Sequence, residues 1–411
     1  MKTRSMRSSK NPVMRFMSDI LQRAGLAERL GQTFGGSRDL YDTFGYRDNP
    51  SFDDYLSYYQ RGDIAAKIID IPPRTTWRHS PIIRSDSQEF IDGVAALNKR
   101  LSLFHWMQRV DEIGGIGQFG LLLFGTRGAP IDQPPGRLTS PEDLIYLNAF
   151  HQGSVEVGDL VDDSEDPRYN QPESYKVTLA GTTTGGGRAG ATKLPWQRVL
   201  HVAENPVEGT LYGRPRLQAV LNRIDDLNKV LGGAAELYWQ NVGGIWHADL
   251  SPDVAVEEGD LDQFEDDFLE ARHGLTRLIQ TRGMTLKTVS GEPIDPTGAY
   301  KALIQVITAA AEIPERVLFG SERGQLAGDQ DQKEWQARIA TRQQLHAEPK
   351  ILRPTLERLQ SFGILPEAEW EADWPPLDSP STIDRADTAQ KFADAISKVA
   401  PEGAPDLVMP P

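Results

Sequence analysis

Apolar residues recur at intervals of three and four over two stretches of the chain, as they do on the buried face of a helix. In the longer stretch, 217–239, the apolar positions of one face are Leu217, Val220, Leu221, Ile224, Leu227, Val230 and Leu231. Gly243 and Gly244 follow it, and Pro314 follows the second stretch, 299–313. The pattern therefore predicts two apolar-faced helices that lie far apart in the chain.

Prolines set the expected limits of two further helical patterns, 64–70 and 331–360. A proline lacks the backbone donor that a helix uses, and its ring crowds the preceding turn. The Pro72–Pro73 pair is therefore expected to end the first helix. Pro349 and Pro354 are expected to kink the second helix or to split it in three.

Short β-type runs dominate residues 113–203, after one or two helices expected over 88–110. The runs are 121–124, 144–147, 154–157, 174–179 and 197–202, with a glycine-rich tip at 181–187. A second, smaller block contains strands at 245–250, 275–279 and 285–289 and an acidic helix at 260–272. The chain is therefore predicted to be an α+β protein.

The composition limits what such a fold can do. Lys and Arg number 44 against 59 Asp and Glu, a formal net charge of −15, whereas domains that bind DNA through a basic surface usually have a pI above about 9. Cysteine is absent, which excludes disulfides, cysteine-based zinc or iron–sulfur sites and a thiol nucleophile. We expect a soluble, intracellular protein, because no apolar run is long enough to span a membrane and the basic N-terminus lacks the apolar core of a secretory signal.

Two motifs suggest chemistry, and the pattern around each argues against it. Gly115-Ile-Gly-Gln-Phe-Gly120 matches G-x-G-x-x-G, but a dinucleotide site follows a strand and opens a helix. Here a helix is expected before the motif and a strand after it, which favours a glycine-rich turn. The acidic helix at 260–272 places many carboxylates on one face, which indicates a solvated or partner-binding surface. Because P-loop, H-E-x-x-H and G-x-S-x-G motifs are also absent, we expect no enzyme, cofactor or metal site.

The order of these modules is more informative than any single motif. Leu211-Tyr-Gly-Arg-Pro-Arg-Leu217 leads into the helix that ends Tyr238-Trp-Gln-Asn-Val-Gly-Gly-Ile245. Ile313-Pro-Glu-Arg-Val-Leu-Phe-Gly320 and Gly328-Asp-Gln-Asp-Gln-Lys-Glu-Trp335 follow later in the chain. With these segments in this order, residues 40–360 resemble the bacteriophage portal protein (head–tail connector) family.

The resemblance implies a portal-type fold with wing, stem helices, a small α/β clip insertion and a long C-terminal helical segment, assembled as a ring of about twelve subunits. The implied parts are a basic N-terminal arm (1–39), the wing (40–212), a first stem helix (213–242), the clip (243–291), a second stem helix (292–313), a tunnel loop (314–330), wing or crown helices (331–374) and a Pro-rich tail (375–411).

The resemblance also implies partners and a location. Double-stranded genomic DNA would pass through the ring without sequence recognition, packaged by the large terminase and later ejected. The major capsid protein, the scaffold protein and head-completion or adaptor proteins would bind the ring, which would sit at a capsid vertex of the virion after assembly in the host cytoplasm, with no membrane partner and no cofactor. Some relatives carry a C-terminal phosphodiesterase domain with two H-x-T/S motifs, which this sequence lacks.

Three groups of site residues follow from the resemblance. The tunnel-loop group at the DNA channel is Glu315, Arg316, Ser321, Glu322, Arg323, Gln325 and Asp329. The clip group, expected to dock terminase, is Asp262, Glu265, Asp266, Asp267 and Glu270. The stem-packing group, expected to meet a neighbouring subunit, is Leu303, Val306, Ile307 and Ala310. An acidic channel with Arg316 and Arg323 as isolated positive charges suits a conduit, because carboxylates repel phosphates and prevent tight DNA binding.

The sequence is also compatible with two other functions. The first is a nucleotide- or glycan-acting hydrolase that uses the carboxylates of 260–270 and works as a monomer or dimer. The second is another oligomeric capsid or tail protein without a central tunnel. A ring with an opening wide enough for duplex DNA distinguishes the portal from both.

Overall fold

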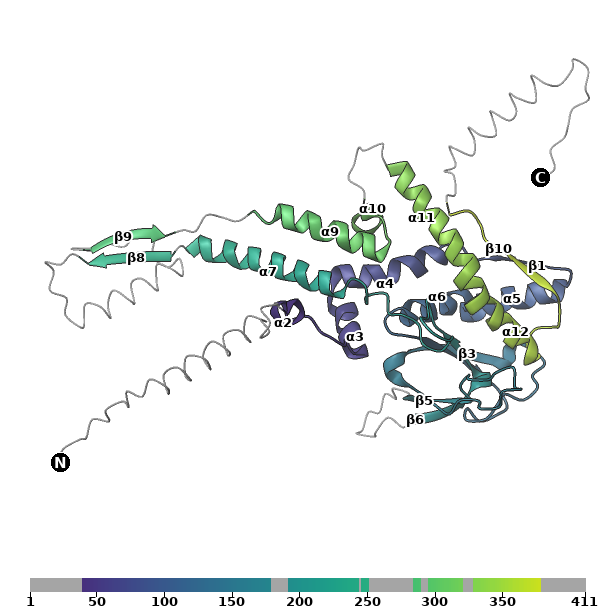
Figure 1. The fold of residues 1–411 in the computed structure, drawn as a ribbon. Coiled ribbons are helices and arrows are strands. Elements are labelled where there is room, and N and C mark those ends of the chain that lie inside the picture. The colour runs from purple at the N-terminus through teal and green to yellow at the C-terminus, as the bar shows by residue number, and fades with distance from the viewer. Residues whose placement is uncertain are drawn as a thin grey trace, which may run out of the picture. The chain divides into compact units, whose positions relative to one another are not determined.

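The computed structural model describes residues 39–178, 191–243, 245–250, 284–289, 295–320 and 328–377 of the 411-residue chain. The chain divides into two compact units, each assembled from segments that are far apart in sequence (Figure 1). Unit 1 comprises residues up to Ser51 together with Leu217–Glu315. Unit 2 comprises Phe52–Arg216 together with the residues from Arg316 onward.

Unit 2 mixes helices with short strands. Its helices are α3 (Phe52–Arg61), α4 (Asp63–Thr76), α5 (Gln88–Leu101), α6 (Leu103–Gly114), α11 (Gly328–Arg342), η4 (Gln343–Leu352, π-helical) and α12 (Arg353–Ser361), and α10 (Glu315–Phe319) begins at the boundary with unit 1. Its strands are β1 (Ile82–Ser85), β2 (Gly120–Thr126), β3 (Leu144–His151), β4 (Val155–Val157), β5 (Ser174–Thr178), β6 (Ala191–Pro195), β7 (Val199–Val202) and β10 (Trp370–Asp373). The described part of unit 2 also contains three single 3₁₀ turns, at Pro141–Asp143, Gln152–Ser154 and Trp196–Arg198.

Strand β2 lies at the centre of unit 2. It pairs antiparallel with β3 on one side and β7 on the other, and all seven of its residues are buried. Successive side chains of a strand point to opposite faces. Leu122 and Phe124 join the large apolar cluster formed with α5, α6 and α12, whereas Leu121 and Leu123 join a second cluster with the antiparallel sheet β4–β5–β6. Because both faces are covered, this strand is apolar throughout.

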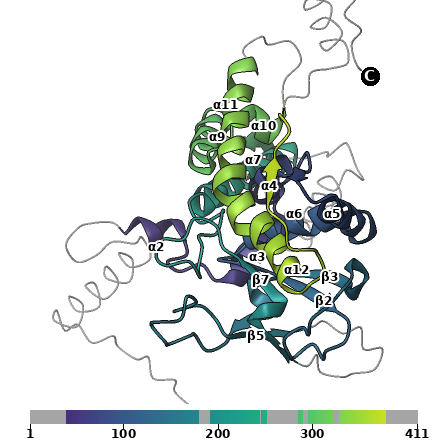
Figure 2. The same cartoon turned by 90° about the vertical axis from the view of Figure 1, so that its right-hand side faces the viewer.

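The predicted helical regions 88–110 and 331–360 are confirmed. The first region forms α5 and α6, which are separated at Ser102, a residue with a positive φ of 55°. The second forms α11, η4 and α12 in succession (Figure 2). Pro349 lies inside η4 and Pro354 lies at the start of α12, so the prolines change the helical hydrogen-bonding pattern without ending the helical run.

The prediction that the Pro72–Pro73 pair ends its helix is wrong, because α4 continues to Thr76. In a regular helix, residue 73 would donate to the carbonyl oxygen of Ile69, four residues earlier. Arg216 Nη1 donates to that oxygen instead, at 2.9 Å. A side chain from a distant part of the sequence thus replaces the donor that the proline lacks.

Unit 1 contains the two long apolar-faced helices that the sequence predicts. They are α7 (Leu221–Gly243) and α9 (Thr297–Ala311), which lie side by side (Figure 1). The strands β8 (Ile245–Leu250) and β9 (Met284–Val289) pair antiparallel between them in the chain, and a five-residue helix, α2 (Leu40–Phe44), completes the described part of the unit.

The strands expected at 245–250 and 285–289 are confirmed as β8 and β9. The expected strand 275–279, the acidic helix 260–272 and the glycine-rich tip 181–187 lie outside the described residues. Among the described helices, none is long and apolar enough to cross a membrane.

Candidate functional site

The structure describes only part of the predicted sites. Glu315 is exposed at the start of α10, and Asp329 belongs to the first turn of α11. The tunnel-loop residues outside the described part of the chain are Ser321, Glu322, Arg323 and Gln325. The whole clip group also lies outside it: Asp262, Glu265, Asp266, Asp267 and Glu270.

The segment between α10 and α11 has anchored ends. Gly320 follows α10 with a φ of +92°, a conformation that favours glycine. Lys67 Nζ of α4 donates to the carbonyl oxygen of Leu318 at 3.1 Å. Arg316 Nε lies 3.8 Å from Asp331 Oδ2 of α11, so an ion pair links the two ends of the segment. Arg316 therefore has a carboxylate partner within one chain.

The predicted stem-packing group on α9 is divided by burial. Ile304 and Ile307 are the buried residues of this helix. Ile307 is already covered within one chain, so it has no surface left for a neighbouring subunit, and its assignment to that contact is corrected. Leu303 is half-buried, whereas Ala310 is exposed and Val306 is 49% exposed.

The apolar face of α7 is covered over only part of its length. Ile224 and Leu227, in the first half, are buried. At 100° per residue, Leu231, Tyr238 and Trp239 continue the same face in the second half. They are 44%, 61% and 79% exposed. We call these three residues the exposed stripe of α7.

The chain before unit 2 packs on the polar face of the same helix. The Tyr46 hydroxyl lies 2.7 Å and 2.6 Å from the two carboxylate oxygens of Asp226. Arg223 Nη2 donates to the Tyr46 hydroxyl at 3.2 Å, and Lys229 donates to the carbonyl oxygen of Phe44. These contacts fix residues 39–47 to α7.

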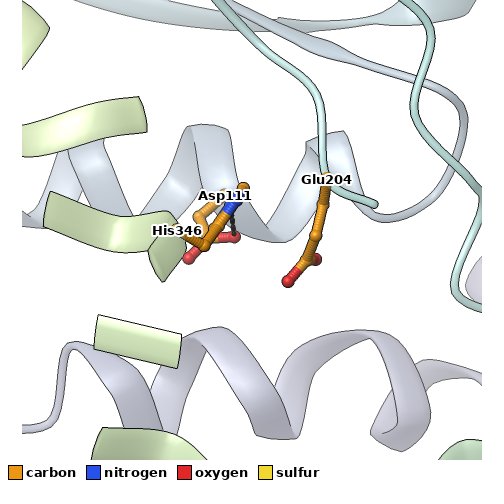
Figure 3. A group of neighbouring side chains, drawn as sticks. All are labelled: Asp111, Glu204 and His346. Carbon is orange, nitrogen blue, oxygen red and sulfur yellow. Dashed lines mark ion pairs between the residues drawn. The ribbon is translucent and has the colours of Figure 1, made fainter. Parts of the chain in front are cut away.

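A buried cluster of charges lies inside unit 2. Its members are Asp111 of α6, Glu204 after β7, Arg216 and Arg342, the last residue of α11; we call these four residues the ion cluster. The Asp111 side chain is 1% exposed, and the two positive and two negative charges balance. His346 of η4 lies beside it, with Nε2 3.5 Å from Asp111 Oδ1 (Figure 3).

Each carboxylate oxygen of the ion cluster accepts from a guanidinium. Arg342 donates to Asp111 Oδ1 at 2.5 Å, to Asp111 Oδ2 at 2.9 Å and to Glu204 Oε1 at 2.7 Å. Arg216 Nη2 donates to Asp111 Oδ1 at 3.0 Å and to Glu204 Oε2 at 2.5 Å, and its Nε donates to Glu204 Oε2 at 2.9 Å. A planar guanidinium, with several donors in a fixed fork, can make paired contacts to one carboxylate and still reach a second one.

The lack of a side chain at Gly115 leaves room for Arg216 to reach the ion cluster. The backbone N–H of Arg216 donates to the carbonyl oxygen of Gly115 at 3.0 Å. A Cβ added at Gly115 would come within 2.2 Å of Arg216 Nη1. The order predicted around this glycine motif is confirmed, since α6 ends at Gly114 and β2 starts at Gly120. The glycines here allow close approach of protein segments.

The two carboxylates are held in their charged form. Burial alone would raise the pKa of Asp111, but the Arg342 guanidinium and the neighbouring His346 lower it well below its ordinary value. Burial would likewise raise the pKa of Glu204, whereas Arg216 and Arg342 lower it far below the usual range. The geometry therefore depends on both arginines.

Asp111, Glu204 and His346 place possible metal-ligand atoms within 4.8 Å of one another (Figure 3). A divalent cation would have to displace guanidinium donors from the carboxylates and would then lie beside two positive charges. The donor set of these residues therefore fits an ion-pair cluster and does not fit a metal site.

The ion cluster was missed in the sequence. Arg216 belongs to the Tyr212–Arg216 segment that carries the family resemblance, which was the one available signal. Asp111, Glu204 and Arg342 are spread over more than two hundred positions, and no spacing rule connects them. Only the fold brings them together.

One relative and two solved structures illustrate what the chain is similar to. It is 26% identical over 365 residues to the anti-CBASS protein Acb1 of Sphingomonas paeninsulae, a match that covers 82% of this chain and 57% of that protein. The chain thus spans little more than half the length of this relative.

Among solved structures, the fold is similar to a chain in the neck of an empty GTA particle computed with C6 symmetry, with a TM-score of 0.50, 14% identity and coverage of 87% of this chain and 93% of that chain. An HK97 family phage portal protein from Corynebacterium diphtheriae gives a TM-score of 0.42 at 11% identity, over 80% of this chain and 97% of that chain. At such identities the likeness concerns the fold alone. The model of the family described as phage portal protein matches residues 53–398, and because this is most of the chain, the protein belongs to the phage portal protein family.

Proposed function

We propose that the protein forms a ring of about twelve copies at one capsid vertex, through which double-stranded DNA is packaged and later ejected. The observation that carries this proposal is the family match over residues 53–398. The GTA neck chain, similar in fold and part of a particle solved with C6 symmetry, is in keeping with a ring.

Within this ring, unit 1 supplies the stem and the clip. The helices α7 and α9 would be the two stem helices, and residues 243–291, which begin and end with the paired strands β8 and β9, would be the clip. Large terminase and head-completion proteins would dock there. In unit 2, the segment between α10 and α11 would be the tunnel loop, and 331–374 the wing or crown helices.

We propose a structural role and no catalysis. The chain covers 57% of the anti-CBASS relative, and the activity of that protein is not transferred to this one. The sequence contains no H-x-T/S motif, and the two carboxylates brought together in unit 2, Asp111 and Glu204, are engaged by arginines.

Negative-stain electron microscopy of the purified protein tests the proposal. The expected result is a ring with a central opening wide enough for duplex DNA. A compact monomer that hydrolyses a nucleotide or glycan would support the hydrolase and overturn the portal assignment. An oligomer without a central opening would favour another capsid or tail component.

Charge reversal tests the clip separately. Replacing Glu265, Asp266 and Glu270 with Lys is expected to reduce binding of large terminase while rings still assemble, because an acidic face steers a partner of opposite charge. Pull-down with terminase measures the first effect and electron microscopy the second. Unchanged terminase binding would remove this face from the docking site.

A further inference from the structure

The ion cluster joins two segments of unit 2 that lead to different parts of the proposed ring. Arg216 is followed directly by Leu217, the first residue of the second unit-1 segment, which contains α7. Arg342 is the last residue of α11, the helix that follows the tunnel-loop segment. Both arginines bind the same two carboxylates, Asp111 and Glu204.

The end of α11 is fixed at further points. Arg342 Nη1 donates to Thr76 Oγ1 at 2.9 Å, and Gln343 Nε2 donates to the carbonyl oxygen of Thr76 at 2.8 Å. The helix itself is stiff: at 1.5 Å per residue, its fifteen residues span about 21 Å from Gly328 to the ion cluster. A displacement of its first turn is therefore carried to its buried end.

The segment that carries Arg216 is held just as closely. Its amides donate to distant parts of unit 2: Gly213 N to Gln118 O at 2.8 Å, Arg214 N to Glu204 O at 2.9 Å and Arg216 N to Gly115 O at 3.0 Å. One of these acceptors belongs to Glu204, whose side chain binds both arginines. The backbone of this segment and the ion cluster are thus parts of one network.

We propose that the ion cluster couples α11 to the chain segment that enters α7, so that a displacement of either one weakens the attachment of the other. If α11 moves, Arg342 leaves Asp111 and Glu204, and of their two guanidinium partners only Arg216 remains in this buried site. A buried charge that loses a partner is costly, so the remaining contacts rearrange. The relation is reciprocal, because a coupling free energy acts equally in both directions.

Hydrogen exchange of the full-length protein tests the coupling. Arg342→Lys keeps the positive charge but replaces the planar fork of donors with a single ammonium nitrogen, which cannot keep the paired contacts to Asp111 while it reaches Glu204. We expect the amides of Gly213, Arg214 and Arg216 to exchange about fivefold faster or more, at the lower end of measured couplings. Arg216→Lys is expected to raise exchange in the last turns of α11 by a similar factor. The stronger variants Arg342→Met and Arg216→Met should increase both effects where they fold.

Two controls separate coupling from general loosening. Amides of the β5–β6 pair, in another part of unit 2, report global opening and should change less than those of residues 213–216. Arg84→Met removes a guanidinium from an exposed pair that joins β1 and β10, and it should leave both reporter segments unchanged. An increase confined to the element that carries the substitution, or equal everywhere, overturns the proposal.

The consequence for DNA passage rests on the proposed function: contacts of DNA with the tunnel loop would be transmitted through α11 to the start of the first stem helix. The exchange experiment does not depend on that assignment. A missing ring would overturn the portal function and leave the coupling intact. If amide exchange increases in only one of the two segments, residues 213–216 or the last turns of α11, the coupling alone is overturned.

Discussion

Gly115 shows how a single hydrogen atom in place of a side chain shapes the interior of unit 2. Its carbonyl accepts the backbone N–H of Arg216, and the guanidinium of Arg216 passes where a Cβ would stand. Arg216 also supplies the donor that Pro73 removes from α4. The glycine, the proline and the arginine therefore depend on one another, although they lie far apart in the sequence.

Replacing Gly115 with Ala is expected to lower the free energy of unfolding by about 1–3 kcal/mol, the usual cost of a side chain forced into a packed interior. The new Cβ displaces the Arg216 guanidinium from the ion cluster. Urea denaturation measures the change. Gly136→Ala is the matched control, because a Cβ there meets nothing within 4 Å. Equal stability of the two variants would contradict the tight approach at Gly115.

The ion cluster should make the protein sensitive to acid. The pKa values of Asp111 and Glu204 are lowered in the folded state, while unfolded carboxyls titrate near pH 4. The stabilisation is therefore complete above about pH 4 and is lost as the pH falls below it, since the unfolded chain then binds more protons. The slope is about 1.4 kcal/mol per pH unit for each carboxyl. Urea midpoints between pH 3 and 6 should fall less steeply for Glu204→Gln than for the natural protein; equal slopes would contradict the prediction.

Helix α7 carries different partners on its two faces. Its polar face binds residues 39–47 through Tyr46 and Asp226, whereas its apolar face is buried in the first half and exposed in the second. The sequence pattern predicted this helix from its apolar positions alone. It did not predict the partner of the polar face, because hydrogen bonds between distant residues leave no period in the sequence.

Tyr46→Phe is expected to loosen the segment before α3 and to cost about 1 kcal/mol, the usual net contribution of a hydrogen bond. The phenylalanine keeps the ring contacts with Tyr41 and Phe44 and loses the bond to Asp226. Limited proteolysis should cut residues 39–50 faster. Tyr41→Phe serves as the control, because the Tyr41 hydroxyl has no hydrogen bond to a described residue. Equal cleavage of both variants would count against this anchor.

The sequence predicts most described elements and little of what connects them. Periodicity identified α7 and α9, since each has a regular set of apolar positions, and a short continuous apolar run identified the strand β2. It did not reveal the pairing of β1 with β10, whose partners Ile82 and Asp373 are nearly three hundred residues apart. The sequence did not predict that α4 continues past Pro72 for the same reason. The donor that compensates for the proline, Arg216, comes from a distant part of the chain.

The candidate sites, like the fold, were predicted from the sequence only in part. Family resemblance led to the proposed stem and tunnel-loop segments, whereas burial in the structure shows which of their residues are covered within one chain, Ile307 among them. The exposed stripe of α7 was included in the sequence pattern only through Leu231. Tyr238 and Trp239 belong to a segment that carries the family resemblance, and their exposure, which makes them candidates for a subunit contact, appears only in the structure.

Ring assembly is the last property that these residues predict. A closed ring needs a heterologous contact that each subunit makes with the next, and large exposed aromatic residues are frequent in such interfaces. Replacing Tyr238 and Trp239 together with Ser is expected to shift the protein from rings to smaller species in analytical ultracentrifugation. Folding should be unaffected, because both side chains are already exposed in one chain. Tyr169→Ser, an exposed tyrosine in unit 2, should leave the rings intact. Rings of normal mass in the double variant would show that the exposed stripe of α7 is not a subunit contact, and a loss of rings with Tyr169→Ser would show that exposure alone does not identify one.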